Sequence, residues 1–169
     1  MPDARGTWGE GRRFAVDRMC GRLARWLRIL GHDVAYGPHL RGRALATCAR
    51  REDRILVTRD TRLLRDPDLP PHVFVRSDHF RDQLREVATA VPLAGAPFLA
   101  RCLECNRPLA AIDRDDVRAR VPPFVLERAP HFFHCARCDR IYWPATHRAH
   151  MLEELAALGL AAGANEVGA

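Results

Sequence analysis

The sequence predicts an α/β domain, with a mostly parallel sheet covered by helices, followed by a small metal-binding module. Short apolar runs alternate with stretches of helical periodicity in the first half of the chain, which is the usual pattern of a parallel sheet with helices on its faces. A linker-like segment and two Cys-x-x-Cys pairs follow in the second half. We therefore expect two structural units of different construction.

The first unit contains four predicted strands, each followed by a helical or loop segment. The expected strands are runs rich in β-branched and aromatic residues at 13–17, 32–36, 54–58 and 72–76. Apolar residues recur at helical spacing from Met19 to Leu30, and Gly31 is a natural end for that helix. A second helix is expected over residues 43–51. A third should start after Ser77 or Asp78, either of which can cap it.

A segment with two prolines separates the two units. Residues 91–98, with the sequence VPLAGAPF, have no periodicity, which is typical of a linker. We place the α/β domain at residues 1–95 and the metal module, a zinc ribbon with an apolar C-terminal helix, at 96–160. The Ala/Gly-rich tail at 161–169 is expected to be disordered.

The positive charge is concentrated in the first part of the chain. All 27 basic residues are arginine, and residues 1–100 hold 18 of them against 12 acidic residues, whereas residues 101–169 hold nine of each. A coding bias is the simpler explanation for the absence of lysine, but the net excess fits an anionic partner such as nucleic acid. The sequence has neither a membrane-length apolar run nor a signal-peptide pattern, so we expect a cytoplasmic protein with no membrane partner.

Two Cys-x-x-Cys pairs predict a structural zinc site. Cys102 and Cys105 form the first pair, Cys135 and Cys138 the second, and 29 residues lie between them. This spacing lets both thiolates of a pair reach one tetrahedral ion, and two pairs complete a closed shell of four thiolates. A redox site is one alternative, although such sites carry a single pair. A second alternative is that a nearby histidine replaces one cysteine as a ligand; the candidates are His131, His134, His147 and His150.

Three aspartates follow predicted strands. Asp17, Asp60 and Asp78 come after the first, third and fourth strands, and the carboxyl ends of parallel strands meet at one edge of a sheet. If the three converge, their mutual repulsion would favour Mg²⁺ or Mn²⁺, which can activate water for phosphodiester cleavage. An aspartate in this position is more often a helix cap or a turn residue, and that alternative stays open.

A stripe of arginines follows Asp17 at intervals of three to four residues, which places its members on one side of the first predicted helix. A solvated face is the default interpretation. Four like charges repel one another, however, and a phosphate backbone would relieve that repulsion. Two more arginines flank Asp60. The predicted RNA-binding residues are Arg18, Arg22, Arg25, Arg28, Arg59 and Arg62.

Six runs of the sequence form a more specific pattern: FAVD at 14–17, GRLARWLRILG at 21–31, RILVTRD at 54–60, QLRE at 83–86, RCLECN at 101–106 and CDRIYWP at 138–144. Together they resemble the ribonuclease-like domain at the C-terminus of the Mut-seven exonuclease, a branch of the PIN-domain nucleases with a fused zinc ribbon. The resemblance covers nearly the whole chain. It implies a PIN-like three-layer α/β/α fold, RNA as substrate, and hydrolysis with Mg²⁺ or Mn²⁺. Asp17 and Asp60 would be the catalytic metal ligands, and Asp78 a further catalytic acid.

One stretch departs from the family pattern. The family usually has one or two acids that open the second helix, whereas residues 37–43, GPHLRGR, contain none and offer only His39 as a ligand. The leading hypothesis is a metal-dependent PIN-like ribonuclease. The alternative is a catalytically impaired RNA-binding protein, with the ribosome or tRNA among its candidate partners. A third hypothesis is that the zinc module binds another protein through exposed aromatic residues among Phe132, Phe133, Tyr142 and Trp143.

Overall fold

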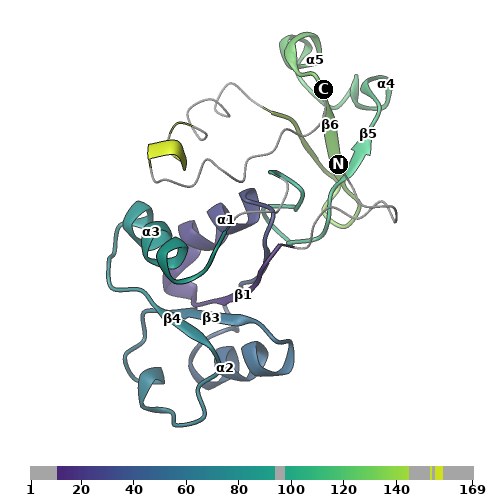
Figure 1. Cartoon of the computed structure of the whole chain (residues 1–169). Coiled ribbons are helices and arrows are strands. Elements are labelled where there is room, and N and C mark those ends of the chain that lie inside the picture. The colour runs from purple at the N-terminus through teal and green to yellow at the C-terminus, as the bar shows by residue number, and fades with distance from the viewer. Residues whose placement is uncertain (1–10, 94–97, 145–152, 154, 158–169) are drawn as a thin grey trace, which may run out of the picture.

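A four-stranded parallel sheet forms the centre of the first domain (Figure 1). The computed structural model describes residues 11–93, 98–144, 153 and 155–157. The strands lie in the order β2-β1-β3-β4, and each neighbouring pair is parallel. Their bounds are β1 Arg13–Val16, β2 Asp33–Ala35, β3 Ile55–Thr58 and β4 His72–Phe74. The expected α/β class with a mostly parallel sheet is confirmed.

Helices cover both faces of this sheet, which makes three layers. Helices α1 (Gly21–Ile29) and α3 (Phe80–Ala90) pack on one face, and α2 (Gly42–Arg51) packs on the other. Successive strand residues point to opposite faces, so Phe14 joins a core cluster with Leu23 and Leu84, while Ala15 joins one with Leu45. Short 3-10 helices follow two of the strands, η1 at Arg18–Cys20 and η2 at Leu63–Arg65.

Helix α3 begins later than the sequence suggested. Its N-cap residue is His79, and neither Ser77 nor Asp78 caps it. The hydroxyl of Ser77 instead accepts a hydrogen bond from the backbone N–H of His79, 3.1 Å away, which forms a turn before the helix. This turn moves Asp78 away from the end of β4.

The second unit is a three-stranded antiparallel sheet with a small core. Strands β5 (Ala110–Ile112), β6 (Phe132–Cys135) and β7 (Arg140–Tyr142) pair in that order, and α4 (Arg114–Val117) and α5 (Pro123–Arg128) connect β5 to β6. Phe132 is buried in the core of this unit and Trp143 packs against it. These two aromatic residues therefore act as core packing. Among the described residues of this unit, Phe124 is a large apolar side chain that is exposed.

Two residues that flank the second unit in the sequence are buried in the core of the first domain. Phe98 and Leu155 are both buried in the cluster that contains Leu23, and the backbone N–H of Leu99 donates to the carbonyl of Ile29 at 2.8 Å. Leu155 belongs to the helical segment that the sequence assigned to the metal module. The predicted boundary near residue 95 and the predicted disordered tail at 161–169 lie outside the described residues. No helix in the described ranges is both long and apolar enough to cross a membrane.

Candidate metal centre and strand-end acidic site

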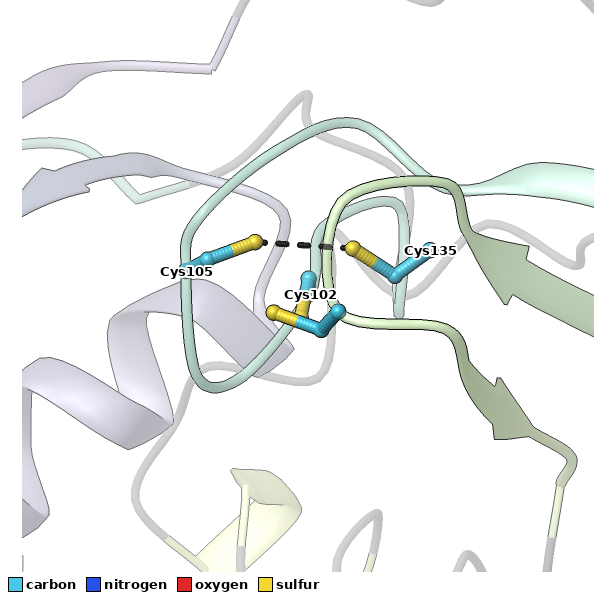
Figure 2. Close-up of side chains that lie close together, drawn as sticks. Cys102, Cys105 and Cys135 are labelled. Carbon is cyan, nitrogen blue, oxygen red and sulfur yellow. Dashed lines mark hydrogen bonds between the residues drawn. The ribbon is translucent and has the colours of Figure 1, made fainter.

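The four predicted zinc ligands form one compact cluster. The sulfur atoms of Cys102, Cys105, Cys135 and Cys138 all lie within 4.8 Å of one another. Figure 2 shows three of them pointing toward one another from two loops, with 3.4 Å between the sulfurs of Cys105 and Cys135. Tetrahedral zinc with Zn–S bonds of about 2.3 Å requires sulfurs separated by about 3.8 Å. The donor set therefore fits a metal ion such as zinc.

The same turn closes each cysteine pair. The backbone N–H of Asn106 donates to the carbonyl of Cys102 at 2.9 Å, and that of Asp139 donates to the carbonyl of Cys135 at 2.8 Å. Asn106 and Asp139 have positive φ angles of 66° and 53°. Asparagine and aspartate adopt this left-handed conformation more readily than other residues with a side chain. The residue directly after each pair is therefore part of the local signal for the turn.

Hydrogen bonds within the sulfur cluster shift the pKa values of its thiols in opposite directions. Burial raises the pKa of the Cys102 thiol, but hydrogen bonds from the backbone N–H of Cys105 and from the Tyr142 hydroxyl outweigh it and lower that pKa to about 6. The hydrogen bond with Cys105 is the main cause that raises the pKa of Cys138 to about 12. Four thiolates this close repel one another unless a cation lies between them, which is the state that metal binding produces.

Arg28 links the cysteine cluster to the first domain. Its side chain donates to the carbonyls of Leu103 at 2.8 Å and Glu104 at 2.9 Å, the two residues between the first pair of cysteines. It also donates to the carbonyl of Val34 in β2 at 2.9 Å. Arg28 is 5% exposed, and its buried guanidinium donates to these three backbone carbonyls, so it is not placed to contact an RNA phosphate. The expectation that Arg28 contacts RNA is corrected: it holds the cysteine loop against α1 and β2.

Asn106 supplies a second link across the same boundary. Its side-chain oxygen accepts from the backbone N–H of Val34 at 2.9 Å, and its amide group donates to the Asp33 carboxylate at 2.8 Å. Arg54 also donates to that carboxylate, at 2.6 Å. Burial raises the pKa of Asp33, but the hydrogen bonds from Arg54 and Asn106 outweigh it and keep that pKa below its usual value. Asn106, the turn residue after the first cysteine pair, therefore also bonds to β2, the edge strand of the parallel sheet.

Asp17 and Asp60 are connected at the carboxyl end of the sheet. Asp17 is 3% exposed and directly follows β1. One of its oxygens accepts from the backbone N–H of Met19 at 3.1 Å, and the other accepts from the Thr58 hydroxyl at 2.8 Å. The same hydroxyl accepts from the backbone N–H of Asp60 at 3.0 Å. Thr58, the last residue of β3, thus ties the two acidic positions together.

The two aspartates fit the way proteins hold Mg²⁺. Each oxygen of Asp17 accepts one of the bonds above and keeps a further lone pair. The Asp60 carboxylate is partly exposed and accepts from the backbone N–H of Arg62 at 2.9 Å. Mg²⁺ is usually bound by one or two carboxylates, with waters and substrate phosphates in the other positions. A buried and a partly exposed carboxylate on neighbouring strands match that pattern.

Asp78 does not join this pair. Its side chain is 77% exposed and lies 3.8 Å from the imidazole of His79. Throughout the described parts of the chain, the four cysteines are the one group of three or more potential metal ligands that lie together. The expected convergence of Asp17, Asp60 and Asp78 is therefore not found. The reason is that Asp17 and Asp60 follow their strands within two residues, whereas Asp78 comes four residues after Phe74.

The remaining predicted arginines have different environments. Arg18, Arg22 and Arg25 are at least partly exposed, and Arg25 lies 3.6 Å from the Glu104 carboxylate. Arg59 donates to the carbonyl of Arg76 at 3.5 Å, beside the end of β4. Arg62 has a highly exposed side chain and lies 3.7 Å from the Asp60 carboxylate. We refer to these five residues, without Arg28, as the basic surface.

The start of α2 has no acidic residue in its first turn, as the sequence indicated. Arg41 and Arg43 are exposed there, and neither forms an ion pair with a carboxylate in the described part of the chain. His39 is also exposed.

Glu86 on α3 was not predicted as a site residue. Its two oxygens accept backbone N–H bonds from Arg76 at 2.8 Å and Ser77 at 3.0 Å, which fixes the turn after β4. Burial, then the charge of Asp17, raise the pKa of the Cys20 thiol to about 11, and Glu86 adds to this. Both carboxylates therefore act on one thiol. The QLRE run at 83–86 contains Glu86, but nothing in its spacing indicates this contact.

Comparison with known proteins gives one match. The family model described as "Mut7-C RNAse domain" matches residues 12–155. Neither a search of curated proteins nor a search of solved structures found a significant match. The matched range includes Asp17, Asp60 and the four cysteines, so it spans both units of the fold.

Proposed function

Because this chain belongs to the Mut7-C RNAse domain family, we propose that it cleaves RNA with a Mg²⁺ or Mn²⁺ ion held by Asp17 and Asp60. The family match confirms the resemblance seen in the sequence and indicates a nuclease-type, RNA-related function. The observation that carries the finer proposal is the Thr58 hydroxyl, which bonds both to the Asp17 carboxylate and to the backbone of Asp60.

The residues around the two aspartates have complementary roles in this proposal. A bound divalent cation would polarise the scissile phosphate and activate a water molecule. Thr58 orients the buried carboxylate of Asp17, and the exposed Arg62 would bind phosphate oxygens and stabilise the charge that develops on them. Glu86 holds the turn after β4 in place.

The basic surface and the cysteine module would bind the rest of the RNA. Arg18, Arg22 and Arg25 continue the positive charge along α1 from the strand ends, and Arg59 and Arg62 extend it on the other side. The cysteine cluster would hold a structural zinc ion and offer a second contact surface for RNA. We also propose a cytoplasmic location, because paired cysteines of this spacing are typical of metal ligands in reducing compartments.

The absence of an acid in the first turn of α2 favours a second candidate function. With two rather than three or four carboxylates near the strand ends, the protein would bind RNA through the same surface without cutting it. The ribosome and tRNA are candidate partners in that case. This hypothesis predicts binding that weakens with salt and no turnover.

Cleavage of a pool of single-stranded and structured RNA separates the two candidates. The zinc-loaded protein would be compared with its Asp17→Asn, Asp60→Asn and Asp53→Asn variants, with Mn²⁺, with Mg²⁺ or with neither. The metal-free condition should be prepared by omission, because a chelator would also remove zinc from the cysteines. Asp53→Asn is the matched control, since Asp53 is an exposed acid that precedes β3, at the opposite end of that strand from Asp60.

We expect metal-dependent cleavage by the unsubstituted protein and by Asp53→Asn, and loss of cleavage in the other two variants. RNA binding without cleavage under every metal condition would favour the binding-only function. Cleavage that persists in both Asp17→Asn and Asp60→Asn would contradict the proposed site.

A further inference from the structure

A pocket opens beside the strand-end acids, between the start of α1 and the start of α3. It has a volume of about 630 Å³, which is in the range of roughly 300–1,000 Å³ found for small-ligand sites. Its walls come from residues 19–22, from residues 78–83 and from Arg85. The first wall starts two residues after Asp17, whose carboxylate bonds to the backbone of Met19. We call it the Phe80 pocket.

Phe80, in the wall of the pocket, packs against other flat side chains. The rings of Trp26 and Phe80 lie 5.7 Å apart, centroid to centroid, and are inclined by 22°. The guanidinium carbon of Arg22 lies 4.2 Å from the centroid of Phe80, and that of Arg81 lies 5.1 Å from it. A guanidinium that already rests on an aromatic ring has lost much of its freedom before a ligand arrives. Arg22 is therefore a preformed flat surface.

Met19 gives the mouth of the pocket an apolar edge. Its side chain is 57% exposed, although it lies next to the fully buried core of η1 and α1. Exposed single apolar residues are common and need no explanation by themselves. Here the exposed Met19 lines the same pocket as Arg22, where its thioether can contact the face or edge of a planar ligand.

The charges around the Phe80 pocket indicate which part of a nucleotide it suits. Arg22, Arg81 and Arg85 face two acids, Asp78 and Asp82, and Arg85 is already paired with Asp82 at 2.7 Å. Two carboxylates in the wall would repel the negative charge of several phosphate groups. Flat side chains and polar groups that surround a small cavity instead suit a nucleobase, which presents π faces and hydrogen-bonding edges.

We propose that the Phe80 pocket binds one unstacked nucleobase of a single-stranded RNA, with the base lying against Arg22. This rests on the proposed function, because the adjoining phosphate would lie at Asp17 and Asp60. It also narrows the substrate: the RNA segment next to the cleavage position must be unpaired, since a base within a helix could not enter.

Binding of a short single-stranded RNA that carries 2-aminopurine tests this inference, because stacking quenches the fluorescence of that base. The titration uses the full-length, zinc-loaded protein without Mg²⁺ or Mn²⁺, so that the RNA stays intact. A second RNA is identical except for an abasic site in place of the 2-aminopurine. The test variants are Arg22→Lys, which keeps the charge but loses the plane, and Phe80→Leu. Arg13→Lys is the control, at the opposite end of β1.

We expect the unsubstituted protein and Arg13→Lys to quench 2-aminopurine and to bind the intact RNA more tightly than the abasic one. Arg22→Lys and Phe80→Leu should weaken binding of the intact RNA by about 5- to 50-fold and leave binding of the abasic RNA nearly unchanged. Arg22→Lys changes a side chain outside the buried core, so it tests the inference even if Phe80→Leu fails to fold.

Two outcomes would overturn the assignment, and they differ in their consequence. If Arg22→Lys weakens binding of both RNAs equally, Arg22 contacts the RNA backbone and not a base. If 2-aminopurine is not quenched, the base does not enter the stack, and in both cases the Phe80 pocket is not a base site. The proposed function would survive that result. If the unsubstituted protein binds neither RNA, the proposed function fails together with the inference.

Discussion

At the scale of single residues, Thr58 determines how the two strand-end aspartates are placed. Thr58→Val keeps the shape of the side chain but removes the hydroxyl that donates to Asp17 and accepts from the backbone of Asp60. We expect a free energy of unfolding lower by about 1–3 kcal/mol, because buried groups lose their partners. We expect metal-dependent cleavage to fall by about 10- to 100-fold, as when groups that support metal ligands are removed. Urea denaturation and initial cleavage rates measure the two effects.

Thr89→Val is the matched control for that substitution. Thr89 lies on α3, and its hydroxyl donates to the carbonyl of Arg85 in the same helix, at 2.9 Å. An exposed change of this kind should alter the free energy of unfolding by less than about 0.5 kcal/mol. If Thr58→Val cleaves RNA as fast as Thr89→Val does, the hydroxyl bridge has no part in the function.

His32 gives the fold a specific dependence on pH. The ring is fully buried, its Nδ1 accepts from the backbone N–H of Arg12 at 3.2 Å, and burial lowers its pKa from 6.5 to about 4. The unfolded chain therefore takes up a proton below pH 6.5 that the folded protein accepts only near pH 4. As the pH falls through this window, the contribution of His32 should reduce the free energy of unfolding by about 3 kcal/mol in total.

Denaturation at several pH values between about 7 and 4 measures this effect as a difference between variants. His32→Asn cannot take up the proton, so its stability should fall less with decreasing pH than that of the unsubstituted protein. The exposed His39→Asn is the control and should follow the unsubstituted protein. Equal pH slopes for all three proteins would show that His32 is not the titrating group.

At the scale of helices and strands, local patterns predicted most of the first domain. The expected strand at 54–58 and helix at 43–51 differ by one residue from β3 and α2 at their starts, because their apolar periodicity and flanking turns are contained in the segment itself. The approach of Asp17 to Asp60 also followed from the sequence, since parallel neighbouring strands end at the same edge. Thr58 as the connecting residue was not predicted, because a threonine at the end of a strand has no distinctive pattern.

The role of Arg28 could not be predicted from periodicity. Spacing along α1 placed it in the same stripe as Arg22 and Arg25, but a loop 75 residues later covers it. The same limit applies to Glu86 and to the stacked side chains at Phe80, whose partners lie on other elements. Contacts that depend on how distant segments pack leave no signal in the local order of residues.

Arg28→Lys tests the link between α1 and the cysteine loop. A lysine keeps the charge but cannot donate to the carbonyls of Val34, Leu103 and Glu104 at once. We expect a free energy of unfolding lower by about 3 kcal/mol and zinc affinity lower by about 10- to 100-fold. Competition with a chromophoric chelator measures the zinc affinity.

Arg25→Lys is the control on the same helix, because Arg25 is exposed and only approaches Glu104. We expect it to keep the zinc affinity of the unsubstituted protein. If Arg28→Lys also keeps that affinity, the buried guanidinium supports the fold of α1 but does not support the metal centre.

At the scale of the whole molecule, two kinds of contact join the two units. One is made by the first cysteine loop, and the other by residues before and after the cysteines in the sequence. Arg28 and Asn106 connect the first cysteine loop to α1 and β2, and Phe98 and Leu155 contribute to the first core. A metal ion at the cysteines should therefore stabilise part of the first domain as well as the module that contains it.

Hydrogen exchange with and without zinc tests this coupling. Removal of zinc should increase exchange in β5, β6 and β7, and also in residues 27–36, where α1 and β2 contact the loop. Exchange in α2 on the opposite face of the sheet should change least, so it serves as the internal control. If exchange increases in the module alone, the two units are independent despite their contacts.

The central claim is that Asp17 and Asp60 hold a divalent cation, and Mn²⁺ binding measures it most directly. Electron paramagnetic resonance of free Mn²⁺ would be followed as zinc-loaded protein is added, with Asp17→Asn, Asp60→Asn and Asp78→Asn compared at equal concentration. We predict that the unsubstituted protein and Asp78→Asn remove Mn²⁺ from solution, and that the other two variants, shown to be folded by circular dichroism, do not. If all four proteins bind Mn²⁺ equally, or if none binds it in the presence of RNA, the strand-end acids are not a metal site and the proposed catalytic mechanism is wrong.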